Sequence, residues 1–332
     1  MKQVFITGAS GFIGGHLAQR LAVLGTNIHV LLRKTSRNGH LLHSRIRIFD
    51  GDLLDVDRIR TAMTGCSHVV HLAGLAKMWT KDPHDYFRVN VSGTKNVLDA
   101  ASDLNVEKII VTSTAGVFPP AVAHPSNEES LKHPQLFTEY EKSKNQAEEL
   151  AIQYFKNGLP VLVVNPAKVY GPGPVNDSNT ATMMVRGYLA GRWRFIPGNG
   201  SGKMNYVYID DVVEGIISAL DKAQPGSQYI LGGENASYDQ FFDLVKELSG
   251  LDRRLFHLPY ALIRSIAWFG DLKAALGSPP FITSEWIKKL PFDWSKDISK
   301  ATRDLDYHPR SLREGLKQTI MWLRKTGGID YI

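Results

Sequence analysis

The chain begins with a short apolar run followed by three closely spaced glycines. It reads Lys2-Gln-Val-Phe-Ile-Thr7, then Gly8-Ala-Ser-Gly11-Phe-Ile-Gly14, and continues into a stretch with helical character. The apolar run predicts a buried parallel strand. Glycines three residues apart let the backbone turn tightly and let a pyrophosphate approach the N-terminus of the next helix, where the dipole and free N–H groups attract anions. In this strand–turn–helix context the glycines predict a dinucleotide-binding site.

The second predicted strand, Asn27-Ile-His-Val-Leu-Leu32, is followed by cations. In NAD-binding proteins of this type, a carboxylate roughly 20 residues past the glycines bonds the ribose 2′-hydroxyl. The first 49 residues contain no Asp or Glu, and Arg33, Lys34 and Arg37 stand at this place instead. Guanidinium and ammonium groups are the partners that a 2′-phosphate requires. We therefore expect NADP as the cofactor, with NAD as the alternative; a solvated basic loop is the competing interpretation.

The composition limits the class of protein. The 332 residues, 43% hydrophobic and 22% charged, are typical of a globular protein with ample core. A single cysteine, Cys66, excludes an intrachain disulfide and fits a reducing compartment. A buried strand begins at once, so we expect no signal peptide and a cytoplasmic location. The longest apolar stretch, 258–276, contains charged residues and predicts an amphipathic helix rather than an integral membrane segment.

The net charge of +6 does not indicate nucleic acid as a partner, because the basic residues are dispersed and no recognition motif accompanies them. A basic surface that attracts an anionic cofactor or small-molecule substrate is the better interpretation. The sequence predicts no metal site.

Strand-like and helix-like segments alternate through the first half of the chain, and such alternation predicts an α/β fold. We expect a doubly wound parallel sheet (a Rossmann fold) in residues 1–164, with 203–232 rejoining it. We assign 165–202 and 233–332 to a smaller, C-terminal substrate-binding domain. The predicted strands are 4–6, 27–32, 46–49, 68–72, 108–112, 161–164, 206–209, 228–231 and 255–258, and the predicted helices are 55–63, 86–104 and 140–156.

Tyr140 and Lys144 lie one turn apart on one face of a predicted helix. The strand at 108–112 is followed by Ser113 and Thr114, and ligands of such sheets bind at the carboxyl ends of strands. A hydroxyl group, a tyrosine and a lysine form a set capable of proton transfer. A lysine ammonium beside the phenol would lower its pKa from near 10. We predict Thr114, rather than Ser113, as the catalytic hydroxyl, because the pleat should point Ser113 to the opposite face.

These motifs together resemble the extended short-chain dehydrogenase/reductase superfamily (the NAD-dependent epimerase/dehydratase family) over nearly the whole chain. The elements occur in the family's order: Thr7-Gly8 through Gly14, Asp52-Leu53, His71-Leu-Ala-Gly74, Asn90-Val-Ser-Gly-Thr94, Thr112-Ser-Thr-Ala115, Tyr140 with Lys144, Asn165-Pro166 with Gly171-Pro-Gly173, and Tyr206-Val-Tyr-Ile-Asp-Asp211. The family usually has Ser where this chain has Thr114. A threonine keeps the hydroxyl and adds a methyl group that restricts its rotamers.

The resemblance implies that Tyr140 is the general acid/base, that Thr114 orients the substrate oxygen, and that Lys144 holds the nicotinamide ribose. It also implies a homodimer formed through the helices that contain Asn90 and Tyr140. The expected cofactor-binding residues are Gly8, Ser10, Gly11, Phe12, Ile13, Gly14, Arg33, Lys34, Arg37, Asp52, Leu53, Leu72, Ala73, Gly74, Asn90, Thr112, Tyr140, Lys144, Pro166, Ala167 and Val169.

Two enzyme classes within the superfamily remain open. One is similar to dihydroflavonol reductases and 3β-hydroxysteroid dehydrogenases, which interconvert a ketone and a secondary alcohol on an apolar substrate; the many aromatic residues after Phe256 suit it. The other is similar to sugar-nucleotide epimerases and dehydratases with bound NAD. Those enzymes commonly carry an arginine where this chain has Met204, and dehydratases an acidic pair where it has Thr138-Glu139. We favour the first class; a catalytically silent NADP-binding regulator is a third alternative.

Overall fold

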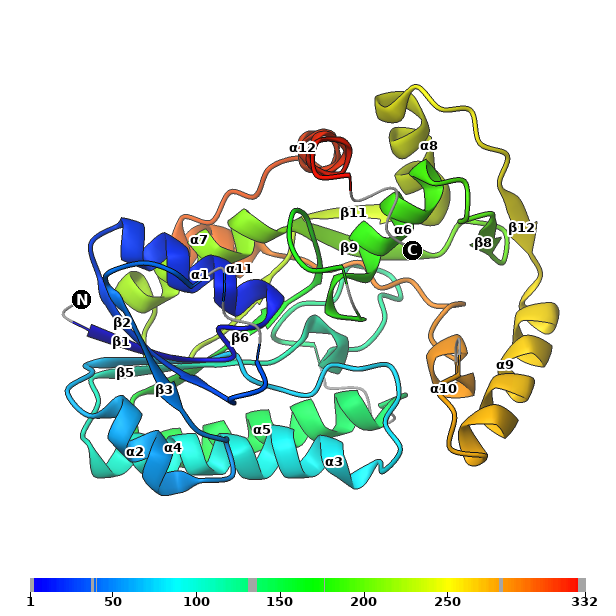
Figure 1. Ribbon diagram of the computed structural model, residues 1–332. Coiled ribbons are helices and arrows are strands. Elements are labelled where there is room, and N and C mark those ends of the chain that lie inside the picture. Colours follow the sequence, from blue (N-terminus) through cyan, green and yellow to red (C-terminus); the bar gives the residue numbers. More distant parts are fainter. Residues whose placement is uncertain are drawn as a thin grey trace.

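The apolar runs of the first half of the chain form a parallel sheet of seven strands in the order β10-β6-β5-β4-β1-β2-β3 (Figure 1). The computed structural model describes residues 3–36, 39, 41–130, 136–175, 177–280 and 283–327. The sheet confirms the predicted doubly wound α/β fold. Its strands are β1 (Gln3–Thr7), β2 (Asn27–Leu32), β3 (Ile46–Asp50), β4 (His68–His71), β5 (Lys108–Thr112), β6 (Val161–Pro166) and β10 (Gln228–Leu231).

Helices cover both faces of this sheet, as Figure 1 shows, with α1, α7 and α11 on one side and α2, α4 and α5 on the other. Except for the edge strand β3, which has no buried residue, the strands between them bury apolar side chains on both faces, which is why they read as continuous apolar runs. These helices are α1 (Phe12–Val23), α2 (Val56–Met63), α3 (His84–Phe87), α4 (Gly93–Asp103), α5 (Glu139–Lys156), α7 (Ile209–Lys222) and α11 (Ser299–Leu305).

The predicted helix at 86–104 contains an irregularity. Between α3 and α4 the backbone forms a π-helical turn, η1 (Arg88–Ser92), whose residue Asn90 is fully buried. Such turns occur frequently at functional sites, because they redirect one side chain. Two 3-10 turns, η2 (Ala115–Val117) and η3 (Asp177–Asn179), follow further along the chain.

Two small sheets and five helices make up the rest of the chain within the described ranges. β7 (Lys168–Tyr170), β9 (Lys203–Tyr208) and β11 (Glu234–Ser237) form one sheet, and β8 (Phe195–Pro197) pairs with β12 (Phe256–Leu258) in the other. The sequence patterns did not predict β7, β8 or β11, because β7 and β8 run directly into Gly- and Pro-rich stretches and β11 has the mainly polar sequence Glu-Asn-Ala-Ser. The helices here are α6 (Thr180–Leu189), α8 (Tyr238–Ser249), α9 (Tyr260–Ala275), α10 (Ser284–Ile287) and α12 (Leu312–Lys325).

The segment 203–232 divides between the two parts of the molecule. α7 packs against α1, and β10 extends the large sheet beside β6. β9, however, pairs with β7 and β11 instead, so the expectation that the whole segment rejoins the large sheet is wrong for this strand. The reason is that β9 pairs in parallel with β7, the strand that follows β6 in the sequence and lies outside the large sheet. No helix in the described ranges is long and apolar enough to cross a membrane.

Candidate active site

The glycine loop joins β1 to α1 with little room for side chains. Gly8 has a φ of +78°, and its amide and carbonyl groups close a turn in which the Gly11 N–H donates to the Gly8 carbonyl at 2.9 Å. A Cβ on Gly8 would lie 2.6 Å from the backbone nitrogen of Ala73, and one on Gly14 would lie 2.3 Å from the Gly8 carbonyl oxygen. The first turn of α1 contains no acidic residue. Its N-terminus therefore presents free N–H groups and a positive dipole to the neighbouring cavity.

A cavity runs from this loop to Tyr140, and most of the predicted cofactor-binding residues line it. The described residues that were predicted but do not line it are Ser10, Arg33, Lys34, Asp52, Leu53, Ala73 and Asn90; of these, Ala73 donates its N–H to the Thr7 hydroxyl. The predicted residues that line the cavity are Gly8, Gly11, Phe12, Ile13, Gly14, Leu72, Gly74, Thr112, Thr114, Tyr140, Lys144, Pro166, Ala167 and Val169.

The cations after β2 lie at the edge of the molecule. Arg33 and Lys34 are exposed, and neither forms an ion pair within the described residues. Arg37 lies outside the residues that the structure describes. At the end of β3, Asp52 is exposed and accepts a hydrogen bond from the Leu54 N–H at 3.0 Å. These side chains follow neighbouring strands of one sheet, so they border the same end of it.

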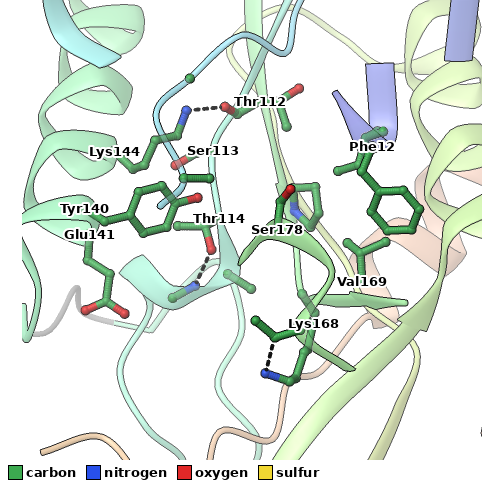
Figure 2. A pocket seen from close by; sticks show the side chains of 18 of the residues that line it. Phe12, Thr112, Ser113, Thr114, Tyr140, Glu141, Lys144, Lys168, Val169 and Ser178 are labelled. Atoms are coloured by element: carbon green, nitrogen blue, oxygen red, sulfur yellow. Dashed lines mark hydrogen bonds between the residues drawn. The ribbon is translucent and has the colours of Figure 1, made fainter. Parts of the chain in front are cut away.

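Tyr140 and Lys144 project from the first turns of α5 toward the end of β5 (Figure 2). The helix begins at Glu139 because the Thr138 hydroxyl caps it, accepting the Glu141 N–H. The Lys144 ammonium donates to the Thr112 carbonyl at 2.6 Å. The end of β5 and the start of α5 thus place the hydroxyl of Thr114, the phenol of Tyr140 and the ammonium of Lys144 around one cavity.

Thr114 and Ser113 both line this cavity. β5 ends at Thr112, and the backbone is still extended at Thr114, with a φ of −149° and a ψ of 144°, before η2 begins at Ala115. The Thr114 hydroxyl accepts the Gly116 N–H at 3.2 Å and lies beside the Tyr140 phenol (Figure 2). The choice of Thr114 over Ser113 as the catalytic hydroxyl stays a prediction. The Ser113 and Thr112 hydroxyls are buried and find no partner within the described part of the protein.

The protein's own groups do not lower the pKa of Tyr140, contrary to the sequence-based expectation. Burial raises the pKa of Tyr140 to about 12, the Glu141 carboxylate adds to this rise, and the hydrogen bond with Thr114 opposes it. The ammonium of Lys144 donates to a backbone carbonyl and does not contribute to the shift. Burial in turn lowers the pKa of Lys144 to about 8, with Glu148 opposing. Tyr140 is therefore a neutral phenol in the protein alone, ready to donate a proton.

A buried polar chain links β1, β4 and α4 behind the cavity. His71 lies 2.7 Å from the Thr7 hydroxyl through Nδ1 and 3.0 Å from the Thr94 hydroxyl through Nε2. The Thr94 hydroxyl donates to the Asn90 carbonyl, and the Asn90 amide donates to the Ser143 hydroxyl at 2.9 Å. Asn90 also accepts the Leu75 N–H at 2.7 Å, which fixes the loop after Gly74. Ser143 was missed as a site residue, since an isolated Ser carries no sequence signal, and Thr7 was assigned to the glycine motif but not to the site.

We expect His71 to make stability depend on pH. Burial, with a smaller contribution from Lys144, lowers the pKa of His71 from 6.5 to about 3. Between these values the unfolded chain binds a proton that the folded protein excludes, so this contribution is full above pH 6.5 and decreases as the pH falls toward 3. The free energy of unfolding should fall by up to about 1.4 kcal/mol per pH unit in this window.

Urea unfolding at pH 7, 6 and 5 measures this dependence. His71→Asn should flatten the slope, whatever its effect on absolute stability. The matched change His43→Asn, at an exposed histidine, should leave the slope unchanged. A slope that is the same in all three proteins would contradict the assignment.

The cavity fits a dinucleotide. Its glycine-lined end, where a Cβ on Gly8 or Gly14 would meet backbone atoms, offers an unopposed helix N-terminus for a pyrophosphate. Its other end is lined by Thr114, Tyr140 and Lys144. No cluster of His, Cys, Asp and Glu in the described ranges could hold a metal ion.

Comparison with known proteins agrees with this architecture. The model of the NAD dependent epimerase/dehydratase family matches residues 4–232. The chain belongs to this family. It is an NAD(P)-dependent oxidoreductase of the extended short-chain dehydrogenase/reductase type, as the sequence motifs predicted.

Relatives of this chain carry several different activities in their names. It is 28% identical to a putative dihydroflavonol 4-reductase from Synechocystis, over 97% of this chain and 95% of that protein. It is 29% identical to sterol demethylase protein B from Methylococcus capsulatus, over 98% of this chain and 99% of that protein. The solved UDP-glucose 4-epimerase of Thermotoga maritima, with UDP-glucose, is 26% identical and superposes with a TM-score of 0.81, covering 98% of this chain and 99% of that chain.

Proposed function

We propose that this family member is an NADP(H)-dependent oxidoreductase that interconverts a ketone and a secondary alcohol on a largely apolar small molecule. The observation that carries the proposal is a cavity that starts at the glycine loop and reaches Tyr140 and Thr114, and whose lining also includes the rings of Trp286 and Trp294. A relative named as a dihydroflavonol reductase supports the same class of reaction.

The roles of the side chains follow from their positions. A nicotinamide cofactor held at this end of the cavity would supply the hydride-transfer chemistry. Tyr140 gives its proton to the substrate oxygen during reduction, which suits its raised pKa, and Thr114 bonds and orients that oxygen. Lys144 holds the nicotinamide ribose and is itself fixed by the Thr112 carbonyl. The tryptophan rings exclude water from the reacting carbon.

The alternative is an NAD-dependent sugar-nucleotide epimerase or dehydratase, which the similarity to the Thermotoga enzyme favours. Against it, Met204 lines the cavity where the diphosphate-binding arginine of such enzymes commonly stands. The two are separated by incubating the protein with a panel of apolar ketones and, separately, UDP-sugars, while following the absorbance of reduced cofactor. Cofactor consumption with ketones supports our proposal. Interconversion of UDP-sugars without net consumption, by protein that retains NAD on purification, contradicts it.

The cations after β2 lead us to expect that NADPH binds at least about tenfold more tightly than NADH, since one charge-assisted contact is worth about that factor. Arg33→Ser should remove most of this preference and leave NADH affinity within about twofold. Fluorescence titration of both cofactors measures it. Arg254→Ser removes an exposed arginine far from the cofactor cavity and serves as the control. Equal affinities for the two cofactors in the unmodified protein would rule out the NADP assignment.

A further inference from the structure

Three lysines line the part of the cavity that is formed by the second half of the chain. They are Lys168 of β7, Lys289 after α10, and Lys296 before α11. Among the described residues that line the cavity, Glu141 is the one acidic residue. Three ammonium groups therefore face one carboxylate, in addition to Lys144 beside the cofactor.

The ammonium groups of Lys168 and Lys296 donate hydrogen bonds to protein atoms, but each has at least one further N–H that these bonds do not use. Lys296 is 4% exposed, and its Nζ donates to the Ser126 hydroxyl at 2.6 Å and the Pro119 carbonyl at 3.0 Å. Lys168 donates to the Thr180 hydroxyl at 3.0 Å. An ammonium group has three donors, so both lysines keep capacity for a ligand. Neither forms an ion pair with a carboxylate in the described chain.

Lys289 connects the cluster to the reacting groups. Its ammonium pairs with the buried carboxylate of Glu141, the residue next to Tyr140. It also lies 4.6 Å from the ring centroid of Trp294 and 5.2 Å from that of Trp286. Lys296 lies 5.4 Å from the same Trp294 ring. The cations and the aromatic walls thus form one surface beside Tyr140.

The charges of this cluster repel one another. Burial lowers the pKa of Lys168 to about 8 and that of Lys296 to about 7, and the nearby charge of Lys289 contributes in both cases. Gathering like charges in a partly buried cavity is unfavourable unless an opposite charge joins them. An anionic group on the substrate would relieve this repulsion and use the spare donors.

A carboxylate fits this place better than a diphosphate. In a nucleotide sugar, the sugar ring separates the diphosphate from the reacting carbon, whereas the cluster here reaches Glu141, directly beside Tyr140. The aromatic walls also suit an apolar body next to the charge. We propose that Lys168, Lys289 and Lys296 bind the carboxylate of an otherwise apolar oxo or hydroxy acid, close to its reacting carbon. This inference rests on the proposed function, since it describes the substrate of that reaction.

Calorimetric titration of cofactor-loaded protein with decanoate and with decanamide tests the subsite, because these probes differ in charge and share the apolar chain. We expect decanoate to bind at least about tenfold more tightly. Lys168→Met and Lys296→Met should each weaken decanoate binding about tenfold and leave decanamide within about twofold. Lys168→Arg, which keeps the charge, should restore most of the decanoate affinity. Lys317→Met, at an exposed lysine of α12, is the matched control and should change neither affinity. Thermal melting of each variant verifies that it is folded.

Equal affinities for decanoate and decanamide would overturn the proposal. So would lysine variants that weaken UDP-glucose binding and leave decanoate binding intact, because the cluster would then serve a diphosphate. If neutral ketones are reduced while decanoate shows no preference, the proposed function stands and the subsite fails. If decanoate shows the charge-dependent preference while no ketone or oxo acid is reduced, the subsite stands and the proposed function fails.

Discussion

Replacing Tyr140 with phenylalanine is expected to lower kcat by about 10³-fold or more while leaving cofactor affinity within about twofold. The phenol hydroxyl is the group placed to exchange a proton with the substrate oxygen, and its pKa, raised to about 12, keeps that proton in place until transfer. The ring itself packs at 6.5 Å from the ring of Tyr86, and phenylalanine preserves this contact. Steady-state rates with a ketone identified in the panel, together with fluorescence titration of NADPH, measure the two effects separately.

Tyr86→Phe is the matched control for this change. Its hydroxyl donates to the Lys77 carbonyl at 2.8 Å, and Tyr86 does not line the described cavity. Removing that hydroxyl should alter kcat by no more than a few-fold. A Tyr140→Phe protein that turns over as fast as the unmodified enzyme would show that another group supplies the proton.

Replacing Gly8 with alanine is expected to weaken NADPH binding by at least about 100-fold and to lower the free energy of unfolding by about 3 kcal/mol. Two effects combine. The φ of +78° is strained for a residue with a side chain, and the added Cβ would lie 2.6 Å from the Ala73 nitrogen and 2.7 Å from the Leu72 carbonyl carbon. Both neighbours are backbone atoms, so the glycine loop has to move away from β4, and the N-terminus of α1 moves with it.

Gly25→Ala separates these two effects. Gly25 has a φ of +90°, yet a Cβ there would meet nothing within 4 Å. We expect it to cost about 1 kcal/mol of stability through backbone strain and to leave NADPH affinity unchanged. Titration of NADPH and urea unfolding of both variants provide the comparison. If Gly8→Ala behaves like Gly25→Ala in both measurements, the close approach of the loop to β4 does not matter for cofactor binding.

The large sheet and its helices could be predicted from the sequence because each strand and helix is marked by residues within its own segment. Apolar runs of four to six residues, glycines at fixed spacing and a capping Thr138 before a helical stretch each report on their own segment. β7, β8 and β11 were not predicted because two of them run directly into Gly- and Pro-rich stretches and the third is mainly polar, so none shows a clear apolar run. β9 was predicted as a strand, but its partner could not be, since pairing depends on segments far apart in the chain.

The predicted cofactor cavity was also accessible from sequence, because the family's motifs follow one another in order along the chain. The hydrogen-bond partners at the end of β5 were not, because the Thr112 carbonyl accepts from Lys144 of α5, which lies 32 residues further along the chain. The expected effect of Lys144 on Tyr140 was wrong for a similar reason. A spacing of four residues says that the two share a helix face, but only the structure shows that the ammonium is engaged by Thr112.

The sequence by itself determined the fold class, the glycine loop and the presence of a dinucleotide-dependent oxidoreductase, because short contiguous segments encode each of them. Only the tertiary structure brought Lys168, Lys289 and Lys296 together with Glu141 and the two tryptophans. Glu141 and Lys168 lie more than 100 positions before the tryptophans and the other two lysines, and these residues share no motif. Their combined charge is a property of the cavity that the folded chain encloses, and it appears only when β7, α5 and the segment after α10 meet at the end of the large sheet.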